Sequence, residues 1–431
     1  MRTRFAILTA LSLFVLLLCS ACGRSVPMES GVSIPQLELT DVDITEGVEI
    51  ALPQEEGTVR FNRVSFSYQA SAPVRAVCTY RQALRTREEE LLLSSKDRHA
   101  SMLLDGYLDK KTASRLISVR FAPIVAGQRC TLSVSGFTCD LQTVPKDEVL
   151  YLENDRFKAG LKLVWGGGLC YFEDKADSTY GNLLNAHDTG RLVQQSYYGP
   201  TEIEGYENGE FGGSRWPYNP VQGGDLFGNS SKLVALEQDE NRIRVVSRPL
   251  DWAQDGQPTF TYYTNVYTLT DDGLTVENTA VDFLQTAWTP RDQEIPAFYT
   301  ISALKNFVFY DGDKPWTGGP LREEKELPFW GGKPAFVLQD GNDENWCAWT
   351  DDSGYGVGLY SPTADRLLAG RHQFDGTADP NADPTNYVAP LGVFVLHFDE
   401  PFTYTYYLTA GQTDAIRAQF QRVAAAGSTA S

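Results

Sequence analysis

The strongest guide to the fold is a pair of long segments, residues 259–269 and 274–283, in which apolar and polar side chains alternate. Asp271, Asp272 and Gly273 separate the two segments, and residues of these types form tight turns. Alternation on both sides of such a turn is typical of a β-hairpin. Shorter alternating segments recur along the chain, and 37 Gly, 22 Pro and 12% aromatic residues fit a turn-rich β structure. We therefore expect an all-β protein.

These segments fall into two groups along the chain. Residues 37–143 contain closely spaced short strands, which predict a β-sandwich of jelly-roll type. Residues 144–427 contain longer strands and long polar loops, with no strand–helix–strand rhythm and no internal repeat. This second group predicts one large domain in which two antiparallel sheets stack face to face.

The last segment of the chain is the one with clear helical spacing. Ile416, Phe420 and Val423 recur at intervals of four and three residues, so they lie on one face of a helix. We expect this helix to begin at Thr413, whose hydroxyl can cap it, and to end at Gly427.

The first residues have the features of an export signal. Arg2 and Arg4 accompany an apolar stretch at 5–18, which at 14 residues is too short to span a bilayer as a helix (about 20 are needed). The small residues that precede Cys22 resemble the lipobox of bacterial lipoproteins. That resemblance implies cleavage before Cys22 and lipidation of its thiol, with Cys19 as a second possible position.

This N-terminal pattern predicts where the protein resides. Residues 1–21 are then a signal peptide, and residues 22–36, polar with Gly and Pro, are a flexible tether. The mature chain faces the extracytoplasmic side of a bacterial cell membrane, which holds it through the lipid. The alternative is an ordinary secretory signal cut near Ala21, which leaves the protein without an anchor.

The charge balance excludes one class of partner. The chain has 56 acidic and 37 basic side chains, for a formal net charge of −19 at pH 7. A protein this acidic is repelled by phosphate backbones, so we expect no nucleic-acid partner.

The cysteines outside the signal region give no clear framework. Their number is odd, so at least one is a free thiol unless it pairs with another chain, and no spacing fits a zinc site. Cys130 and Cys139 flank a candidate hairpin, and the disulfide state stays open. The five are Cys78, Cys130, Cys139, Cys170 and Cys347.

Two carboxylate-rich turns, residues 311–313 and 379–383, offer the oxygen ligands that Ca²⁺ prefers. The second turn lacks the glycine and the distal glutamate of an EF-hand loop. Solvated turns are the simpler explanation, and we predict no metal or other cofactor.

Polar residues cluster in two segments, 182–199 and 215–225, that do not alternate like strands. Both are rich in Asn, Gln, Tyr, Trp and Gly. Amides, carboxylates and Arg can bind sugar hydroxyls in pairs, while aromatic rings stack on the apolar sugar face. The alternative is a long ordered loop whose polar side chains satisfy backbone groups. The candidate sugar-binding residues are His187, Asp188, Arg191, Gln194, Gln195, Tyr198, Trp216, Asn219, Gln222 and Asp225.

A further candidate, Glu294, lies just before a probable strand. A partly buried Glu can have a raised pKa and serve as general acid or base, whereas a Glu paired with Arg291 would be structural. Glu294 with Asp225 or Asp188 would make the carboxylate pair of a glycosidase. His187 with Tyr198 and Arg191 would suit a polysaccharide lyase, although the net acidity disfavours a polyanionic substrate.

The two polar segments also carry a resemblance. The run NLLNAHDTGRLVQQSYYG at 182–199, followed by YNPVQGGD at 218–225, resembles a motif pair in bacterial exported proteins of the galactose-mutarotase-like type. Segments 294–299, 354–362 and 387–390 are similar to that group as well. The resemblance implies an antiparallel supersandwich whose concave sheet faces a sugar. Mutarotases use a His and a Glu as acid and base, and here only His187 and Glu294 could play those parts.

Three functions remain open from the sequence. The first is a lipoprotein that binds and processes an oligo- or polysaccharide through acid/base work by His187 and Glu294. The second is a non-catalytic lipoprotein that captures glycan for a transporter or an enzyme partner. The third is an envelope scaffold that contacts proteins through the N-terminal sandwich.

Overall fold

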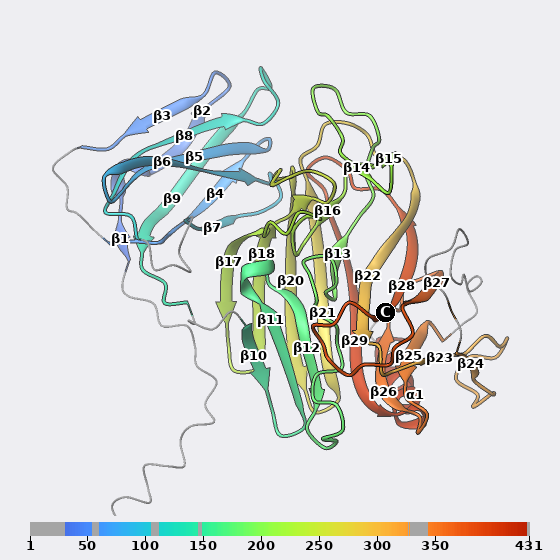
Figure 1. Cartoon of the computed structure of the whole chain (residues 1–431). Coiled ribbons are helices and arrows are strands. Elements are labelled where there is room, and N and C mark those ends of the chain that lie inside the picture. The colour runs from blue at the N-terminus through green and yellow to red at the C-terminus, as the bar shows by residue number, and fades with distance from the viewer. Residues whose placement is uncertain are drawn as a thin grey trace, which may run out of the picture.

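The computed structural model of the chain describes residues 31–53, 60–104, 112–144, 149–325, 327 and 344–428. The predicted signal peptide, Cys22 and the beginning of the tether lie outside the described residues. Two β-rich units lie side by side, and a helix near the C-terminus packs on the second unit (Figure 1). The prediction of a mostly β protein with antiparallel sheets and a C-terminal helix is confirmed.

The first unit is a sandwich of two antiparallel sheets. One sheet contains β1, β9, β4 and β7 with β2 paired to β9, and the other has the order β3-β8-β5-β6. Phe66, Phe121 and Phe137 are buried between them, and Phe66 stacks on Phe137 with ring centroids 5.0 Å apart. Strand β1 begins at Val32, inside the segment expected to be tether. The strands are β1 (Val32–Ser33), β2 (Leu39–Asp43), β3 (Val48–Ala51), β4 (Arg63–Ala70), β5 (Val74–Gln82), β6 (Arg85–Leu93), β7 (His99–Leu103), β8 (Arg115–Pro123) and β9 (Thr131–Asp140).

The second unit consists of two large sheets and smaller pieces. A six-stranded sheet has the order β19-β16-β13-β22-β28-β27, and a nine-stranded sheet has the order β17-β18-β20-β21-β29-β26-β25-β23-β24. Strands β10, β11 and β12 form a third sheet, and β14 and β15 form a small hairpin. The strands are β10 (Val149–Glu153), β11 (Phe157–Lys162), β12 (Gly168–Asp174), β13 (Gln194–Ser196), β14 (Glu210–Phe211), β15 (Ser214–Arg215), β16 (Pro220–Val221), β17 (Lys232–Gln238), β18 (Arg242–Arg248), β19 (Leu250–Asp251), β20 (Thr261–Thr270), β21 (Gly273–Asp282), β22 (Arg291–Ile301), β23 (Asn306–Phe309), β24 (Arg322–Glu324), β25 (Trp346–Thr350), β26 (Tyr355–Tyr360), β27 (Arg366–His372), β28 (Thr385–Phe394) and β29 (Pro401–Gln412).

The two large sheets face each other across one apolar core. Phe298 and Val388 come from the six-stranded sheet, and Tyr263, Val276 and Leu408 come from the nine-stranded sheet, all fully or almost fully buried in one cluster. Alternation along each strand places the next side chains on the opposite face. Each sheet therefore has one face in this core and one outer face.

The hairpin expected around Gly273 is present. Strands β20 and β21 pair antiparallel from Thr261↔Asp282 to Thr270↔Gly273, which leaves Asp271 and Asp272 as the turn. Gly273 itself is the first residue of β21. Its φ is +133°, and a Cβ atom there would lie 2.1 Å from the carbonyl oxygen of Leu408. The glycine is therefore required by the neighbouring strand β29 as well as by the turn.

The prediction of a hairpin between Cys130 and Cys139 is wrong. Cys130 directly precedes β9, and Cys139 lies near the end of the same strand. Gly136, with φ of +63°, takes part in a register shift opposite β4 instead of making a turn. All five described cysteines are free and buried.

The helix expected at the C-terminus is α1 (Thr413–Ser428), which packs on the nine-stranded sheet. Ile416 and Phe420 are buried against Gly358 of β26, where a Cβ atom would collide with both side chains. The Thr413 hydroxyl donates to the carbonyl oxygen of Gly354 (3.0 Å) and so fixes the helix to the sheet. Among the described residues, no helix is both long and apolar enough to cross a bilayer.

The N-terminal sandwich packs on the outer face of the nine-stranded sheet. Val234 and Tyr262 of that sheet, and Phe283 directly after β21, join the apolar core of the sandwich. At the edge of this contact, Arg248 pairs with Glu90 at 3.1 Å. The outer face of the six-stranded sheet lies on the other side of the molecule.

Candidate functional site

The outer face of the six-stranded sheet carries an acidic side chain among tyrosines. On β22 and β28 the paired residues Tyr299 and Tyr387 point away from the core, with ring centroids 4.9 Å apart. Glu294 and Tyr299 are five positions apart and would normally lie on opposite faces. The register shift between Glu294 and Phe298 allows both to reach the outer face.

The Glu294 carboxylate accepts two tyrosine hydroxyls. Oε1 accepts from Tyr387 at 2.6 Å and from Tyr198 at 3.2 Å, and the residue is 8% exposed. Burial raises the pKa of Glu294, because a charge is poorly solvated there, and the two hydroxyls offset part of that rise. A carboxyl group with a raised pKa keeps its proton to a higher pH than an exposed glutamate, which suits a general acid or base.

The tyrosines around Glu294 remain protonated donors. Burial raises the pKa of Tyr198, Tyr299 and Tyr387 well above the usual value, and the nearby Glu294 charge adds to the rise. These hydroxyls can therefore donate hydrogen bonds to the carboxylate or to a ligand oxygen.

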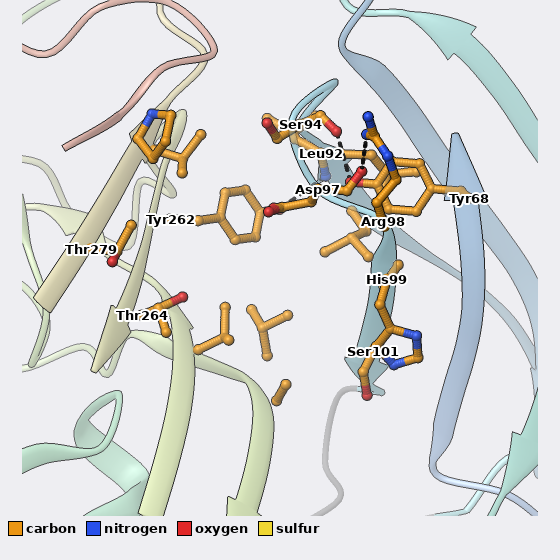
Figure 2. Close-up of a pocket in the computed structure, with 18 of the residues that line it drawn as sticks. Tyr68, Leu92, Ser94, Asp97, Arg98, His99, Ser101, Tyr262, Thr264 and Thr279 are labelled. Carbon is orange, nitrogen blue, oxygen red and sulfur yellow. Dashed lines mark hydrogen bonds between the residues drawn. The ribbon is translucent and has the colours of Figure 1, made fainter. Parts of the chain in front are cut away.

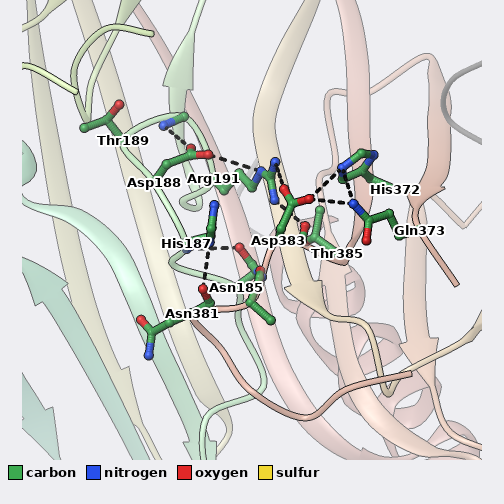
Figure 3. A network of polar contacts seen from close by, with 12 residues as sticks. Asn185, His187, Asp188, Thr189, Arg191, His372, Gln373, Asn381, Asp383 and Thr385 are labelled. Carbon is green, nitrogen blue, oxygen red and sulfur yellow. Dashed lines mark hydrogen bonds and ion pairs between the residues drawn. The ribbon is translucent and has the colours of Figure 1, made fainter. Parts of the chain in front are cut away.

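A charged network lies at the edge of the same face (Figure 3). Arg191 pairs with Asp383 at 2.8 Å and with Asp188 at 3.3 Å. Asp383 also accepts from Gln373 at 2.6 Å and contacts His372 at 3.3 Å. Hydrogen bonding to Arg191 lowers the pKa of Asp383. The network joins the loop before β13 to the loop between β27 and β28.

His187 and Glu294 do not form a pair. The exposed His187 ring contacts the carbonyl oxygen of Asn381 through Nδ1 at 2.7 Å. Two residues earlier, the Asn185 N–H donates to the carbonyl oxygen of Tyr299, five positions along β22 from Glu294. His187 thus lies in the loop that leaves β22 near Tyr299 and returns to it at Gln194. Among the contacts of the described residues, none joins His187 to Glu294, and their role as an acid–base couple stays a prediction.

The two polar segments found in the sequence do lie side by side. Gln194 donates to the carbonyl oxygens of Thr189 (3.1 Å) and Gly190 (2.8 Å) and accepts from the N–H of Gly223 at 2.7 Å. The Thr189 hydroxyl donates to the carbonyl oxygen of Asp225 at 2.8 Å. Gln194 is 1% exposed, so it holds the two segments together and has almost no surface to offer a ligand.

Asp225 organises a loop rather than facing solvent. Its Oδ1 accepts from the N–H groups of Phe227 and Asn229, and its Oδ2 accepts from the Asn229 amide and from the N–H of Gly256. The residue is fully buried. This arrangement gives no support to Asp225 as the partner of Glu294 in a glycosidase pair.

Three further predicted residues are also used inside the protein. Gln195 donates to the carbonyl oxygen of Thr264, and Gln222 to that of Gly166. Asn219 accepts from the Trp216 indole and donates to the carbonyl oxygen of Tyr197. All three amides are at most 2% exposed. The structure gives these side chains the role of positioning the backbone, which was the alternative explanation of the polar clusters.

Sequence reasoning missed several residues of this face. Tyr299 and Tyr387 lie in two of the segments quoted for the resemblance, and strand alternation around Phe298 would have placed Tyr299 outward. Asp383 was considered as a calcium ligand, but it is paired with Arg191. Asp311, in the other acidic turn, pairs with Arg322 at 3.1 Å. In the described part of the chain, no three potential metal ligands gather into one group.

A cavity of about 520 Å³ lies elsewhere, between the two units (Figure 2). Leu92 and His99 of the sandwich and Tyr262 and Thr264 of the nine-stranded sheet contribute to its lining. The Tyr262 hydroxyl accepts from the N–H of Leu92 at 3.3 Å, which ties the two walls together. The lining mixes aliphatic side chains with charged ones, among them Asp97, Arg98, Glu237 and Arg244. The cavity lies on the sandwich-facing side of the nine-stranded sheet, whereas the buried Glu294 carboxylate with its tyrosine partners lies on the other large sheet. We assign the candidate site to the outer face of the six-stranded sheet because of that carboxylate.

Comparison with solved structures finds proteins of mutarotase type. A galactose mutarotase-like protein from Lactobacillus casei is 13% identical over 61% of this chain and 99% of its own, with a TM-score of 0.39. A putative aldose 1-epimerase from Escherichia coli is 13% identical over 61% of this chain and 98% of its own, with a TM-score of 0.37. A 4-alpha-glucanotransferase from Thermococcus litoralis is 15% identical over 60% of this chain and 37% of its own, with a TM-score of 0.30. No family model and no curated protein matches the sequence. Similarity at this level says nothing about what this chain does.

Proposed function

We propose that the protein binds a glycan on the outer face of its six-stranded sheet and that Glu294 transfers a proton to or from the bound sugar. The supporting observation is the Glu294 carboxylate, which is buried, has a raised pKa and is held by two tyrosine hydroxyls. Such a group can protonate a sugar oxygen or remove a proton from a hydroxyl.

The surroundings of Glu294 suit a sugar in other ways. Tyr198 and Tyr299 are partly exposed and combine an aromatic ring with a hydroxyl donor, so each can stack on a sugar face or bind its hydroxyls. Tyr387 is 3% exposed and holds the Glu294 carboxylate. Arg191 lies at the edge of the same face and is held in place by Asp188 and Asp383. Together these residues offer donors, acceptors and apolar surface within one area.

The test is Glu294→Gln, which keeps the shape of the side chain and removes its acid/base function. With a panel of neutral and acidic mono- to tetrasaccharides, we expect turnover to fall by roughly 10²–10⁴-fold while the dissociation constant changes little. Product is followed by mass spectrometry and NMR, and binding by calorimetry. The matched control is Glu277→Gln, an exposed glutamate on β21. Unchanged turnover in Glu294→Gln would exclude the proton-transfer role, and no binding to any saccharide would exclude the glycan site.

A second candidate is glycan capture without chemistry, on behalf of a transporter or an enzyme partner. The observation that favours it is that Glu294 contacts two tyrosine hydroxyls and His187 contacts a backbone carbonyl, so neither side chain contacts the other. Most sugar chemistry needs an acid and a base at one centre. This function predicts that wild-type protein binds saccharides, yields no product, and retains binding in Glu294→Gln. The saccharide panel above therefore separates the two candidates.

We further propose that Cys22 carries a lipid that holds the protein on the extracytoplasmic side of a bacterial membrane. The support is the sequence alone: a basic start, a short apolar stretch and small residues before Cys22. We expect wild-type protein to partition into detergent and Cys22→Ala to move to the aqueous phase; Cys19→Ala is the control. An equal distribution of Cys22→Ala and wild type would contradict the anchor.

A further inference from the structure

A series of aromatic side chains in mutual contact begins beside Glu294. Tyr198, which donates to Glu294, packs against Trp216 with ring centroids 6.0 Å apart. Trp216 packs against Phe211 at 5.0 Å, and Phe211 against Trp252 at 6.1 Å. We call these four residues the aromatic track. All four side chains are partly exposed, so part of each ring can be reached by a ligand.

The far end of the track meets the charged network. A Cβ atom on Gly190 would lie 2.7 Å from the Trp252 indole, so the ring lies directly against this glycine. The Gly190 N–H donates to the Asp188 carboxylate at 2.9 Å, and Asp188 pairs with Arg191. The track therefore begins at Glu294 and ends beside Asp188 and Arg191.

Buried polar residues hold the track in position. Asn219 accepts from the Trp216 indole N–H at 3.2 Å, and its carbonyl oxygen accepts from the backbone N–H of Trp252 at 2.9 Å. The Asp251 carboxylate in turn accepts from the N–H of Asn219 at 3.2 Å. Rings fixed in this way lose little conformational freedom when a ligand stacks on them.

We propose that the aromatic track binds further units of an oligosaccharide whose reacting or terminal unit lies at Glu294; this inference rests on the proposed function. Neighbouring rings meet edge to face at interplanar angles of 70–75°, so the ring surfaces that remain exposed point in different directions. Each exposed surface can then contact a different sugar unit. A single sugar ring covers about one aromatic side chain, so three rings beyond Tyr198 suit a ligand of several units. Trp216, Phe211 and Trp252 then set a preference for chain length.

The proposal is tested by measuring how the affinity of the protein for an oligosaccharide depends on the number of sugar units. The probes are glucose, galactose and N-acetylglucosamine, each with its di-, tri- and tetrasaccharide, titrated by calorimetry. We expect wild-type affinity for at least one series to rise about tenfold from the monosaccharide to the tetrasaccharide. Trp252→Ala and Phe211→Ala should weaken tetrasaccharide binding about tenfold and leave monosaccharide binding within about twofold.

Two further variants separate stacking from folding. Trp252→Phe keeps an aromatic ring and should restore most of the affinity lost in Trp252→Ala. Tyr151→Ala removes an exposed aromatic ring on β10, outside the track, and should change no affinity. Thermal melting checks that each variant is folded.

The outcomes distinguish this inference from the proposed function. Equal affinity for monosaccharide and tetrasaccharide, together with lost turnover in Glu294→Gln, would overturn the track alone. A loss in Trp252→Ala that is equal for both chain lengths would also overturn it. Absence of binding to every probe would overturn the glycan site and the track together.

Discussion

The buried carboxylate of Asp282 shows how strongly a single residue responds to its surroundings. Asp282 lies at the end of β21, is fully buried, and accepts the Thr261 hydroxyl at 2.8 Å and the Trp288 indole at 2.9 Å. Burial raises its pKa to about 7, and these hydrogen bonds offset only part of the rise. The folded protein therefore favours the protonated form of Asp282 far more than the unfolded chain does.

This difference predicts a pH-dependent stability. Because the folded pKa is raised, the contribution of Asp282 is fully present below pH 4 and is lost as pH rises through about 7. The loss is on the order of 4 kcal/mol, at ~1.36 kcal/mol per pKa unit. In Asp282→Asn we expect a flatter dependence of the free energy of unfolding on pH, measured by urea denaturation between pH 4 and 8. The same slope in wild type and Asp282→Asn would contradict the prediction.

At the residue scale, the sequence was most informative about residue types and least about their partners. Glu294 stood out because a carboxylate precedes an apolar strand, and the structure shows it buried beside two tyrosines. Gln194, Asn219 and Asp225 stood out for their clustering, but their polar atoms are bonded within the protein. A polar cluster looks alike in sequence whether it serves a ligand or the backbone, because both need the same donors and acceptors.

At the element scale, a buried ion pair holds helix α1 against the rest of the second unit. Glu344 is 1% exposed and pairs with Arg417 of α1, and it also accepts the Trp346 indole at 2.7 Å. Arg417 donates in addition to the carbonyl oxygen of Gly319 at 2.6 Å. These contacts join the helix to two segments of the second unit, one at Glu344 and Trp346 and the other at Gly319.

We expect Arg417→Ala to destabilise the protein by about 3–5 kcal/mol, because it leaves the Glu344 charge buried without its partner. The measurement is urea denaturation followed by circular dichroism. Removing both partners in Arg417→Met with Glu344→Gln should cost less than Arg417→Ala alone. As a control, Arg422→Ala removes an exposed arginine of the same helix. A similar small effect of Arg417→Ala and Arg422→Ala would contradict the prediction.

Elements were predicted well where local signals and tertiary contacts agree. In the hairpin around Gly273 and in the helix with Ile416 and Phe420, the spacing of apolar residues in the sequence matches the side chains that are buried in the structure. The segment between Cys130 and Cys139 is a single strand, although it contains Gly136 after a serine, a pair that is common in turns. In a strand, however, a glycine with positive φ can instead accommodate an irregular register, and only the pairing with β4 reveals this.

At the scale of the whole molecule, the two units share an apolar contact. Tyr262 is 7% exposed, packs edge-on against Phe283 at 6.0 Å, and belongs to the core of the N-terminal sandwich although it lies on β20. Ser95 of the sandwich donates to the Asp399 carboxylate of the second unit through its N–H at 3.2 Å. We therefore expect the two units to unfold together.

Tyr262→Ala should weaken this coupling. Removing a large buried aromatic side chain costs about 3–5 kcal/mol, and here the loss falls on the contact between the units. We expect the single calorimetric transition of wild type to broaden or to split into two in Tyr262→Ala. Tyr171→Ala, which changes a partly buried tyrosine within the second unit, should leave one transition. A single, merely shifted transition in Tyr262→Ala would contradict the prediction.

The stacking of two sheets gives the second unit two outer surfaces that differ in what they contact. One surface supports the N-terminal sandwich, and the other carries Glu294, with the shared apolar core between them. Substitutions on distant surfaces combine almost additively, since they share no neighbours. Ligand preference can therefore diverge, in evolution or in the laboratory, without loosening the attachment of the sandwich.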